Sequence, residues 1–593
     1  MKKTIITILI VCGLTSSYAQ RPVDPDAPLD IVPKTPEKNP PGRPAVKKPL
    51  APARKNRSPR DPSGDAELIP KLAGLIIVSS DSQVKKEGAP AVTGLVVRDV
   101  PLLQGKDFTA VVAPYLGKPV SENKIRDLED DIVLYCRSKN RPLVDVILLD
   151  QNIENGVLQL WLLEGRIGKV TVENEGSKWF KDSIILSQVS LQTNSTLDAT
   201  KLQSDLDWVN HNPFREVSAQ FKQGEKLGQS DVVLQVHDQI PLRGYVGYED
   251  SGTKFTGEDR LLAGFNWGNV FGLDHQLNYQ YTTDTDFRLV QAHSLSYVAP
   301  LPWRNTVTFF GSYVDAKGDF GSIAPGTVSK GKSYQASMRY EVPLPNIGKY
   351  QHELSAGFDF KKSNNNLEFG GNTVSASDTH VAQFELGYSA VLPDAWGETS
   401  GGIEGYYSPG GLTPENDDAH FNGLRVGARA EYVYGRFTAQ RVTRLPFDFS
   451  WVLRGTVQAA NHRLLPSEQL GLGGYNTIRG YDERFENGDD GWIISNELRS
   501  PALKLGSLNF AFKNPNLDVD YLQFLAFFDY GSLHTLDRVG GDPIDAALSS
   551  VGGGLRYTMG KHLVLRFDYG YELSATSLSG KHSRAHIGVV GSF

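Results

Sequence analysis

The chain has 593 residues and a net charge of −7, from 61 lysine and arginine against 68 aspartate and glutamate residues, which leaves no basic surplus for binding nucleic acid. Hydrophobic residues make up only 40% of the chain, whereas glycine reaches 59 residues and aromatic residues 10%. This composition argues against helical membrane spans and favours strands in which every second residue is apolar, distributed over more than one domain.

The N-terminal residues predict export from the cytoplasm. Lys2 and Lys3 precede an apolar run at 5–14, so residues 1–19 have the features of a signal peptide. Residues 20–65 carry twelve prolines, which predicts an extended linker. No later apolar run reaches the length of about 18 residues that a membrane helix needs. These features leave the periplasm, the outer membrane or the exterior as destinations.

Two α+β units are predicted next, at residues 66–165 and 166–238. In both, the expected order is strand, helix, helix, strand, strand. The expected strands cover 94–100, 142–149, 157–163, 168–172, 215–222 and 231–236, and the expected helices cover 108–115, 122–139 and 197–210. Ser121 is the expected N-cap of the helix at 122–139. Generic α+β modules without a shared ancestry are the alternative interpretation.

The cysteines exclude an intrachain disulfide. Cys12 falls within the predicted signal peptide, which leaves Cys136 as the lone cysteine of the mature chain. Cys136 continues, at helical spacing, the apolar series formed by Ile125, Leu128 and Ile132. We therefore expect a buried thiol with a structural role rather than a reactive one.

From residue 239 to residue 593 the apolar residues recur with period two. Leu354, Ala356 and Phe358, for example, alternate with polar or small residues. This alternation predicts an antiparallel transmembrane barrel with an apolar outer face and a wet lumen. A soluble β-sandwich is the alternative. Sixteen strands are expected, an even number as closure requires, near residues 243, 260, 274, 290, 305, 333, 351, 381, 400, 422, 448, 491, 521, 550, 562 and 584.

A glycine-rich segment at 460–490 connects the eleventh and twelfth of these strands. Glycines allow it to fold compactly, and Arg479 lies near its centre. In a later strand, Asp529 alternates with an apolar face, which is made by Leu522, Phe524, Ala526, Phe528 and Tyr530. Period two therefore turns Asp529 into the lumen. A loop that folds inward would bring Arg479 to this carboxylate, where a bidentate ion pair can hold it.

Two other interpretations of the loop stand beside this pair. Asp568 also faces the lumen by period two, although Arg566 shares its face and would neutralise it. Arg479 could also support only the folding of the loop itself. The hypothesis we carry forward is that Arg479 and Asp529 dock the loop, and that its release is coupled to opening of the barrel.

Several of these motifs resemble those of one family. Ile478, Arg479, Gly480 and Tyr481 resemble the (V/I)RG(Y/F) signature of TpsB transporters of two-partner secretion, the ShlB/FhaC/HecB haemolysin secretion/activation family within the POTRA-barrel assembly factors. Phe527, Asp529 and Gly531 resemble its FxDxG strand motif, and the two α+β units resemble POTRA domains. Further matching residues are Leu163, Gly165, Ile167, Gly168, Asn210, Pro213, Phe214, Gly488, Asp489, Gly491, Asn496, Glu497 and Leu498.

The resemblance implies an outer-membrane pore of a Gram-negative-type cell, with its POTRA-like units in the periplasm. It implies export of a TpsA-like partner, an adhesin or haemolysin of β-helical type, without nucleotide hydrolysis. The POTRA-like units would receive the unfolded partner and the loop would dock in the barrel. The terminal Phe593 resembles the signal by which assembly machinery recognises outer-membrane barrels, so that machinery and membrane lipid are further expected partners. An insertase for other barrels and a passive porin are the alternatives.

The sequence indicates no enzyme, because it shows no catalytic, cofactor-binding or metal-binding pattern. Residues 326–333 match the phosphate-binding pattern GxxxxGK[ST], but the residues that follow alternate as a strand instead of opening a helix. We interpret that match as coincidence. The acidic residues between Glu415 and His420 lack metal-ligand spacing, so we expect a solvated loop there.

Overall fold

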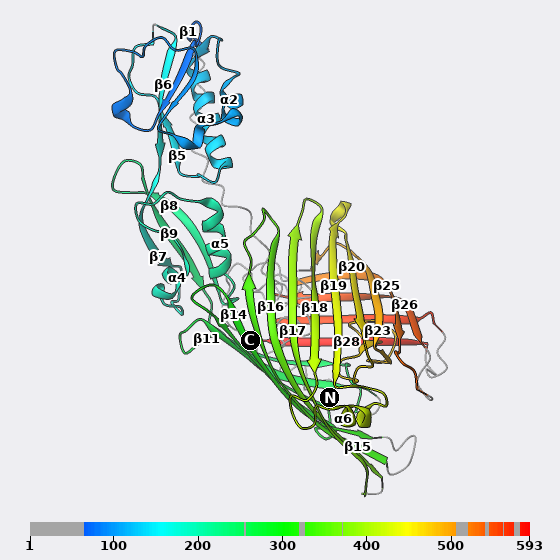
Figure 1. The fold of residues 1–593 in the computed structure, drawn as a ribbon. Helices are drawn as coiled ribbons and strands as arrows, with labels where there is room; N and C mark the ends of the chain where they lie inside the picture. The colour runs from blue at the N-terminus through cyan, green and yellow to red at the C-terminus, as the bar shows by residue number, and fades with distance from the viewer. Residues whose placement is uncertain are drawn as a thin grey trace. The chain divides into compact units, whose positions relative to one another are not determined.

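The computed structural model describes residues 65–593 apart from 154, 254–255, 320–326, 370–371, 506–519, 540–544, 561 and 575–581. The predicted signal peptide and nearly all of the predicted linker lie outside these residues. The chain divides between residues 239 and 240 into two compact units, of which the first is blue to green and the second green to red in Figure 1. No helix in the described part of the chain is long and apolar enough to cross a membrane.

The first α+β region has a four-stranded sheet in the order β3-β2-β6-β5, covered by two helices. Phe108 and Cys136, from the two helices, are fully buried against it, which agrees with the structural thiol that we expect. Burial raises the pKa of the Cys136 thiol to about 11. The elements are β1 (Glu67–Ile69), β2 (Gly74–Val78), η3 (Asp81–Gln83), β3 (Gly94–Arg98), η4 (Pro101–Leu103), α2 (Lys106–Val112), β4 (Val120–Ser121), α3 (Glu122–Ser138), β5 (Val144–Ile147) and β6 (Val157–Glu164).

Strand β2, at the middle of this sheet, is absent from the sequence prediction. Its residues Gly-Leu-Ile-Ile-Val are all buried. Leu75 and Ile77 pack against the helices, while Ile76 and Val78 pack on the opposite face with Ala89. A strand covered on both faces has a continuous apolar run and no alternation, so period two could not reveal it.

The predicted N-cap of α3 is present, since the Ser121 hydroxyl accepts a hydrogen bond from the Lys124 backbone N–H at 3.3 Å.

The second α+β region has a three-stranded sheet in the order β7-β9-β8, with two helices on it. Leu202 and Leu206 of the longer helix pack against Val217, Val232 and Leu234 of the strands. The shorter helix, α4, fits the expected order, but its position in the sequence was not predicted. The elements are β7 (Arg166–Asn174), α4 (Asp182–Gln188), α5 (Ala199–Val209), β8 (Arg215–Gln223) and β9 (Gln229–Asp238).

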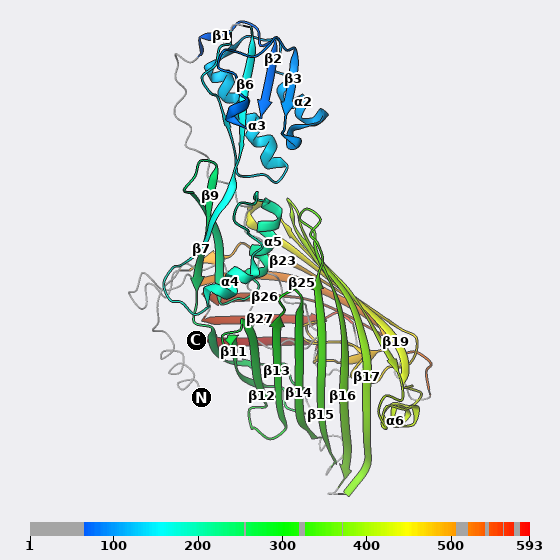
Figure 2. The same ribbon diagram turned by 60° about the vertical axis from the view of Figure 1, so that its left-hand side comes forward.

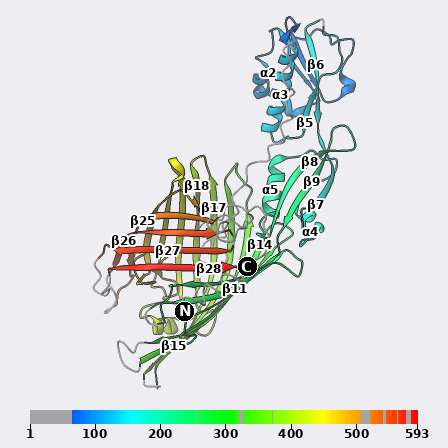
Figure 3. The same cartoon turned by 180° about the vertical axis from the view of Figure 1, so that it is seen from behind.

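The remaining strands form a closed antiparallel barrel, in which β10 pairs with both β11 and β28. Figure 2 shows β12 to β17 side by side, and Figure 3 shows β25 to β28. The strands are β10 (Leu242–Glu249), β11 (Arg260–Val270), β12 (His275–Thr283), β13 (Val290–Pro300), β14 (Thr306–Asp319), β15 (Thr327–Pro343), β16 (Gln351–Phe369), β17 (Asn372–Pro393), β18 (Gly397–Pro409), β19 (Glu431–Arg444), β20 (Ser450–Ala460), β23 (Asp490–Arg499), β24 (Leu503–Lys504), β25 (Asp520–His534), β26 (Ala546–Met559), β27 (Leu563–Glu572) and β28 (Ser583–Ser592).

The predicted sixteen-stranded barrel is confirmed for the described residues, with β23 and β24 counted as one strand because both pair with β25. The alternation holds at β25, where the side chains of Phe524 and Phe528 are exposed on the outer face and Asp529 is buried. The β-dominated class and the preceding α+β regions also agree with the prediction. The residues after the phosphate-binding pattern form a strand as expected, but β15 already begins at Thr327, so residues 327–333 are strand as well; Gly326 is outside the described residues.

The strand predicted near residue 422 is wrong. A short helix lies there, α6 (Asp418–Leu424), and the strand follows it as β19. The Asp417 carboxylate caps α6 by accepting the His420 N–H at 2.9 Å, and Glu415 pairs with His380 at 3.0 Å. The expectation of a loop is corrected from Asp418 onward, where α6 begins, while the Asp417 and His420 side chains remain solvated at 47% and 40% exposed.

Candidate functional site

The connection between β20 and β23, residues 461–489, folds into a hairpin that we call the inward loop. Within it, β21 (Leu470–Leu472) pairs with β22 (Glu486–Gly488). Gly473, Gly474 and Gly480 have φ angles of 102°, 101° and 98°. A side chain at Gly473 would meet the Asp482 carbonyl oxygen at 2.3 Å, so the tight turn requires glycine there.

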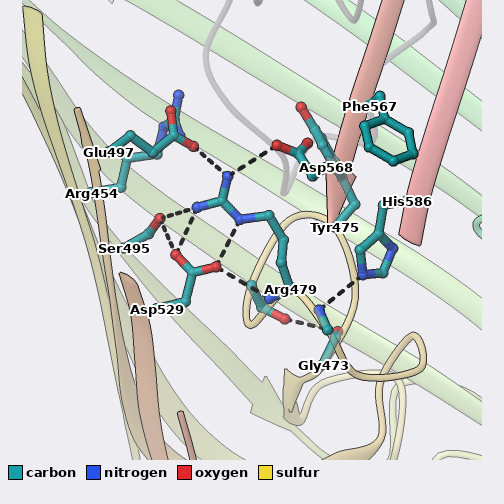
Figure 4. A network of polar contacts seen from close by, with 12 residues as sticks. Arg454, Gly473, Tyr475, Arg479, Ser495, Glu497, Asp529, Phe567, Asp568 and His586 are labelled. Carbon is teal, nitrogen blue, oxygen red and sulfur yellow. Dashed lines mark hydrogen bonds and ion pairs between the residues drawn. The ribbon is translucent and has the colours of Figure 1, made fainter. Parts of the chain in front are cut away.

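Arg479, at the tip of the inward loop, is bound by two carboxylates of the barrel wall (Figure 4). Its Nε donates to Oδ2 of Asp529 and its Nη2 to Oδ1, both at 2.7 Å, which makes the pair bidentate. Its Nη1 donates to Oε1 of Glu497, also at 2.7 Å. Because the side chains of Arg479 and Asp529 are only 3% and 0% exposed, bulk water screens this pair little.

Asp529 receives further donors besides the guanidinium. The backbone N–H of Arg479 donates to Oδ2 at 3.2 Å, and the Ser495 hydroxyl donates to Oδ1 at 2.6 Å. Asp529 on β25 lies directly opposite Ser495 on β23, so both side chains point into the lumen. Asp529, which the sequence predicted as the partner of the loop, is thus bound by both the backbone and the side chain of Arg479.

Asp568 lies close to Arg479, but its shorter ion pair is with Arg556. The Asp568 carboxylate is 3.7 Å from Nη1 of Arg479 and 3.0 Å from Nη2 of Arg556. The expectation that Arg566 neutralises it is wrong, since Arg566 pairs with Glu249 at 3.0 Å. Arg556 and Arg566 are directly opposed across β26 and β27. Two like charges in that position repel each other, which favours separate carboxylate partners.

The other predicted tip residues surround the ion pair. Ile478 is fully buried in an apolar cluster with Leu472 and Tyr481. The Tyr481 hydroxyl donates to the Ser549 carbonyl at 3.0 Å. At Gly480, an added Cβ would lie 3.0 Å from the Gly570 carbonyl carbon, so the loop approaches β27 closely.

The other predicted residues of the barrel wall, Phe527, Gly531 and Phe593, make different contacts. The ring of Phe527 lies beneath the Arg479 guanidinium, 3.6 Å from its central carbon, as a cation–π contact. At Gly531, a Cβ would lie 2.6 Å from Cδ2 of Leu472, so the small residue leaves room for the loop. Phe593 is not part of this site. Its backbone N–H donates to Gly244 of β10 at 2.9 Å, and its side chain is 61% exposed.

Glu497 also lies in this site, bound to Arg479 at 2.7 Å, and the sequence did not predict that position. It is 2% exposed and accepts from Arg454 at 3.0 Å and from Arg499 at 2.6 Å, besides Arg479. It had been named only as a matching residue of the family. Period two would have revealed its direction, because Ser495 and Glu497 alternate on β23 with the exposed Ile494 and Leu498.

A comparison with protein families matches two parts of the chain. The model described as "Haemolysin secretion/activation protein ShlB/FhaC/HecB" matches residues 228–557, which is more than half of the chain. The model described as "POTRA domain, ShlB-type" matches residues 91–165. The first match includes the whole inward loop together with Glu497 and Asp529.

Individual proteins of known name are similar at low identity. The heme/hemopexin transporter protein HuxB of Haemophilus influenzae is 23% identical, over 66% of this chain and 69% of its own. The outer membrane transporter CdiB of Dickeya dadantii is 24% identical, over 68% and 71%. The solved structure of CdiB from Escherichia coli superposes with a TM-score of 0.69 at 19% identity, over 92% of this chain and 94% of that one. This likeness extends the shared fold to nearly the whole chain.

Proposed function

Because the chain belongs to the haemolysin secretion/activation family ShlB/FhaC/HecB, it is an outer-membrane transporter with periplasmic POTRA domains, and we propose that it exports one unfolded partner polypeptide through its barrel. Members of this family are transporters rather than enzymes. The partner is of TpsA-like type, an adhesin or haemolysin with a β-helical fold. Folding of the partner outside the cell prevents its return, so that nucleotide hydrolysis is not needed.

The sheets of the POTRA domains support reception of an unfolded chain. Among the described residues, β8 pairs along one edge with β9, and β3 pairs along one edge with β2. An extended polypeptide can add to the other edge of such a strand through main-chain hydrogen bonds, with little demand on its sequence. This mode suits a long cargo that must be held unfolded and passed onward.

The observation that carries the gating part of the proposal is the buried position of Arg479 between Asp529 and Glu497. With the POTRA domains in the periplasm, β10 starts at the periplasmic rim, so the connection after β20, the eleventh strand, starts at the outer rim. An exposed ion pair contributes about 0–1 kcal/mol, whereas breaking a buried one costs about 3–5 kcal/mol. We propose that this pair holds the loop docked, and that export requires both the docked state and its release or rearrangement in turn, so that a loop that cannot dock no longer supports export.

The experiment that tests this proposal replaces Arg479 with alanine. We expect the barrel to assemble, as judged by its heat-modifiable mobility in gels, while the partner no longer appears in the medium. Arg441→Ala is the matched control, because Arg441 pairs with Asp394 at a strand turn and not with the loop. Normal secretion by the Arg479→Ala protein, at the same amount of assembled barrel, contradicts the proposal.

Phe593 is proposed as the signal for the barrel-assembly machinery. It follows β28 directly, and it is largely exposed. Removal of Phe593 should lower the amount of assembled barrel while the molecules that do assemble export the partner normally. A quantitative immunoblot of outer membranes, read beside the partner secreted per assembled barrel, separates the two effects.

A further inference from the structure

The inward loop has a second buried anchor, Glu468, eleven positions before the Arg479 tip. Glu468 lies near the start of the loop, and its side chain is 0% exposed. Lys361 Nζ donates to its two oxygens at 3.0 and 3.1 Å. Gln383 Nε2 donates at 3.1 Å and the Tyr434 hydroxyl at 2.9 Å. A carboxylate that is buried with this many donors is held in one position.

These donors come from a different arc of the barrel than the partners of Arg479. Lys361, Gln383 and Tyr434 belong to β16, β17 and β19. Asp529 and Glu497 belong to β25 and β23, which follow β20 in the ring of strands. The loop therefore touches the wall on both arcs. Glu468 and Arg479 are eleven positions apart, so the chain between the two anchors reaches at most about 40 Å when fully extended.

The wall around Glu468 is organised independently of the loop. The Gln383 side chain is fixed by the Tyr432 hydroxyl at 2.7 Å and by Asp359 at 3.3 Å. Asp359 in turn forms a bidentate pair with Arg339, at 2.7 and 3.0 Å. Of the residues named in this network Glu468 is the one contributed by the loop, where the Ser467 hydroxyl also donates to it at 2.9 Å. The wall thus presents a preformed set of donors, into which a single carboxylate of the loop fits.

The backbone of Glu468 is also fixed. Nε2 of Gln458, on β20, donates to the Glu468 carbonyl at 3.1 Å and to the Asp489 carbonyl at 3.0 Å. The two ends of the loop are therefore joined through one side chain. Asp489 accepts the Leu464 N–H at 3.0 Å and also binds Arg425. Displacement of the tip alone would leave this end of the loop in place.

We propose that Glu468 and Lys361 form a second latch, so that the loop closes the lumen as a strut held at both ends. This inference rests on the proposed function and assigns Glu468 the role of a positioning residue. Release of Arg479 frees the tip, but full opening requires that Glu468 leaves its donors too. Each latch lowers the open fraction of the barrel, and loss of either one raises it.

The experiment measures the open fraction of the purified full-length protein in planar lipid bilayers. Glu468→Gln and Lys361→Gln should each raise it by at least about tenfold, since losing one charge of a buried pair is strongly destabilising. Lys362→Gln is the matched control, because the neighbouring Lys362 pairs with Asp378 and not with the loop. Exchange of the two charges, in Glu468→Lys with Lys361→Glu, should return the open fraction toward that of the wild type.

The exchange separates a latch from a residue that only helps the loop to fold. A general folding defect would make the double variant at least as open as the worse single variant, and that result overturns the inference. So does a wild-type open fraction in both single variants. If Arg479→Ala blocks secretion while Glu468→Gln leaves the open fraction unchanged, only the second latch is wrong. If Glu468→Gln opens the barrel but no exported protein depends on the gene, the latch stands and the transport function is wrong.

Discussion

Two ion pairs between a basic side chain and an aspartate differ in their expected contribution to stability in the two parts of this chain. In the second α+β region, Lys178 and Asp182 are 2.6 Å apart, and their side chains are 52% and 36% exposed. In the barrel, Arg479 and Asp529 are 2.7 Å apart and are 3% and 0% exposed. The distances are nearly equal, so the surroundings decide the energy. Water and salt screen the first pair, whereas the second is shielded and leaves an uncompensated charge if it breaks.

The strongest test of this contrast removes the carboxylate of the buried pair. Asp529→Ala deletes the acceptor of the Arg479 guanidinium, of its backbone N–H and of the Ser495 hydroxyl. We expect the loop to undock, at a cost of about 3–5 kcal/mol, and secretion to fall as far as in Arg479→Ala. Secreted partner per assembled barrel is the measurement.

A double variant checks that the two residues act together. If Arg479 and Asp529 form one unit, Arg479→Ala with Asp529→Ala should be no worse than either single change. Additive losses would mean that each residue acts through other partners. Secretion above half of the wild-type level in Asp529→Ala would contradict the docking role of the pair.

A smaller effect is expected where the loop approaches the wall without charges. Gly480→Ala would place a Cβ 3.0 Å from the Gly570 carbonyl carbon, at a φ of 98°. Strain of this kind costs about 1–2 kcal/mol, so we expect secretion to be reduced but not abolished. Gly176→Ala is the control, because its φ of 95° is similar and no atom lies within 4 Å of its Cβ. Equal secretion defects in both variants would show that contact with the wall is not the cause.

The smallest effect is expected at the exposed pair of Lys178 and Asp182 in the second α+β region. The Lys178 side chain lowers the pKa of Asp182. The stability linked to that carboxylate is therefore present at neutral pH and is lost as the pH falls through its lowered pKa. Because both groups are more than a third exposed, Lys178→Ala should change the free energy of unfolding by about 0.5 kcal/mol or less at neutral pH. A urea titration measures it, and a loss of several kcal/mol would remove the contrast between the two regions.

The same contrast between exposed and buried surroundings explains what the sequence could predict. A strand with one wet face shows its alternation, and this placed Asp529 in the lumen correctly. A strand that is covered on both faces shows no alternation, so the sequence did not predict β2. The helix α6 was mistaken for a strand, because its place depends on packing of Phe421 against Tyr432 and on the Asp417 cap.

Ion pairs between residues that are far apart in the sequence cannot be predicted from a local sequence pattern alone. Arg479 and Asp529 were paired because both belong to motifs and the direction of one followed from period two. Glu468 and Lys361 are separated by 107 residues and belong to no motif. Their contact depends on the strand register of β16 and on the path of the loop. Only the folded barrel brings them together.

Deletion of the gene tests the central claim, export of a single partner, most directly. The outer-membrane and secreted proteomes of the deletion strain are compared with those of the wild type. We predict that one large β-rich protein disappears from the exterior while the other outer-membrane barrels keep their amounts. If many barrels decline together, the protein is an insertase. If no exported protein changes, transport of a polypeptide is contradicted and a passive pore remains.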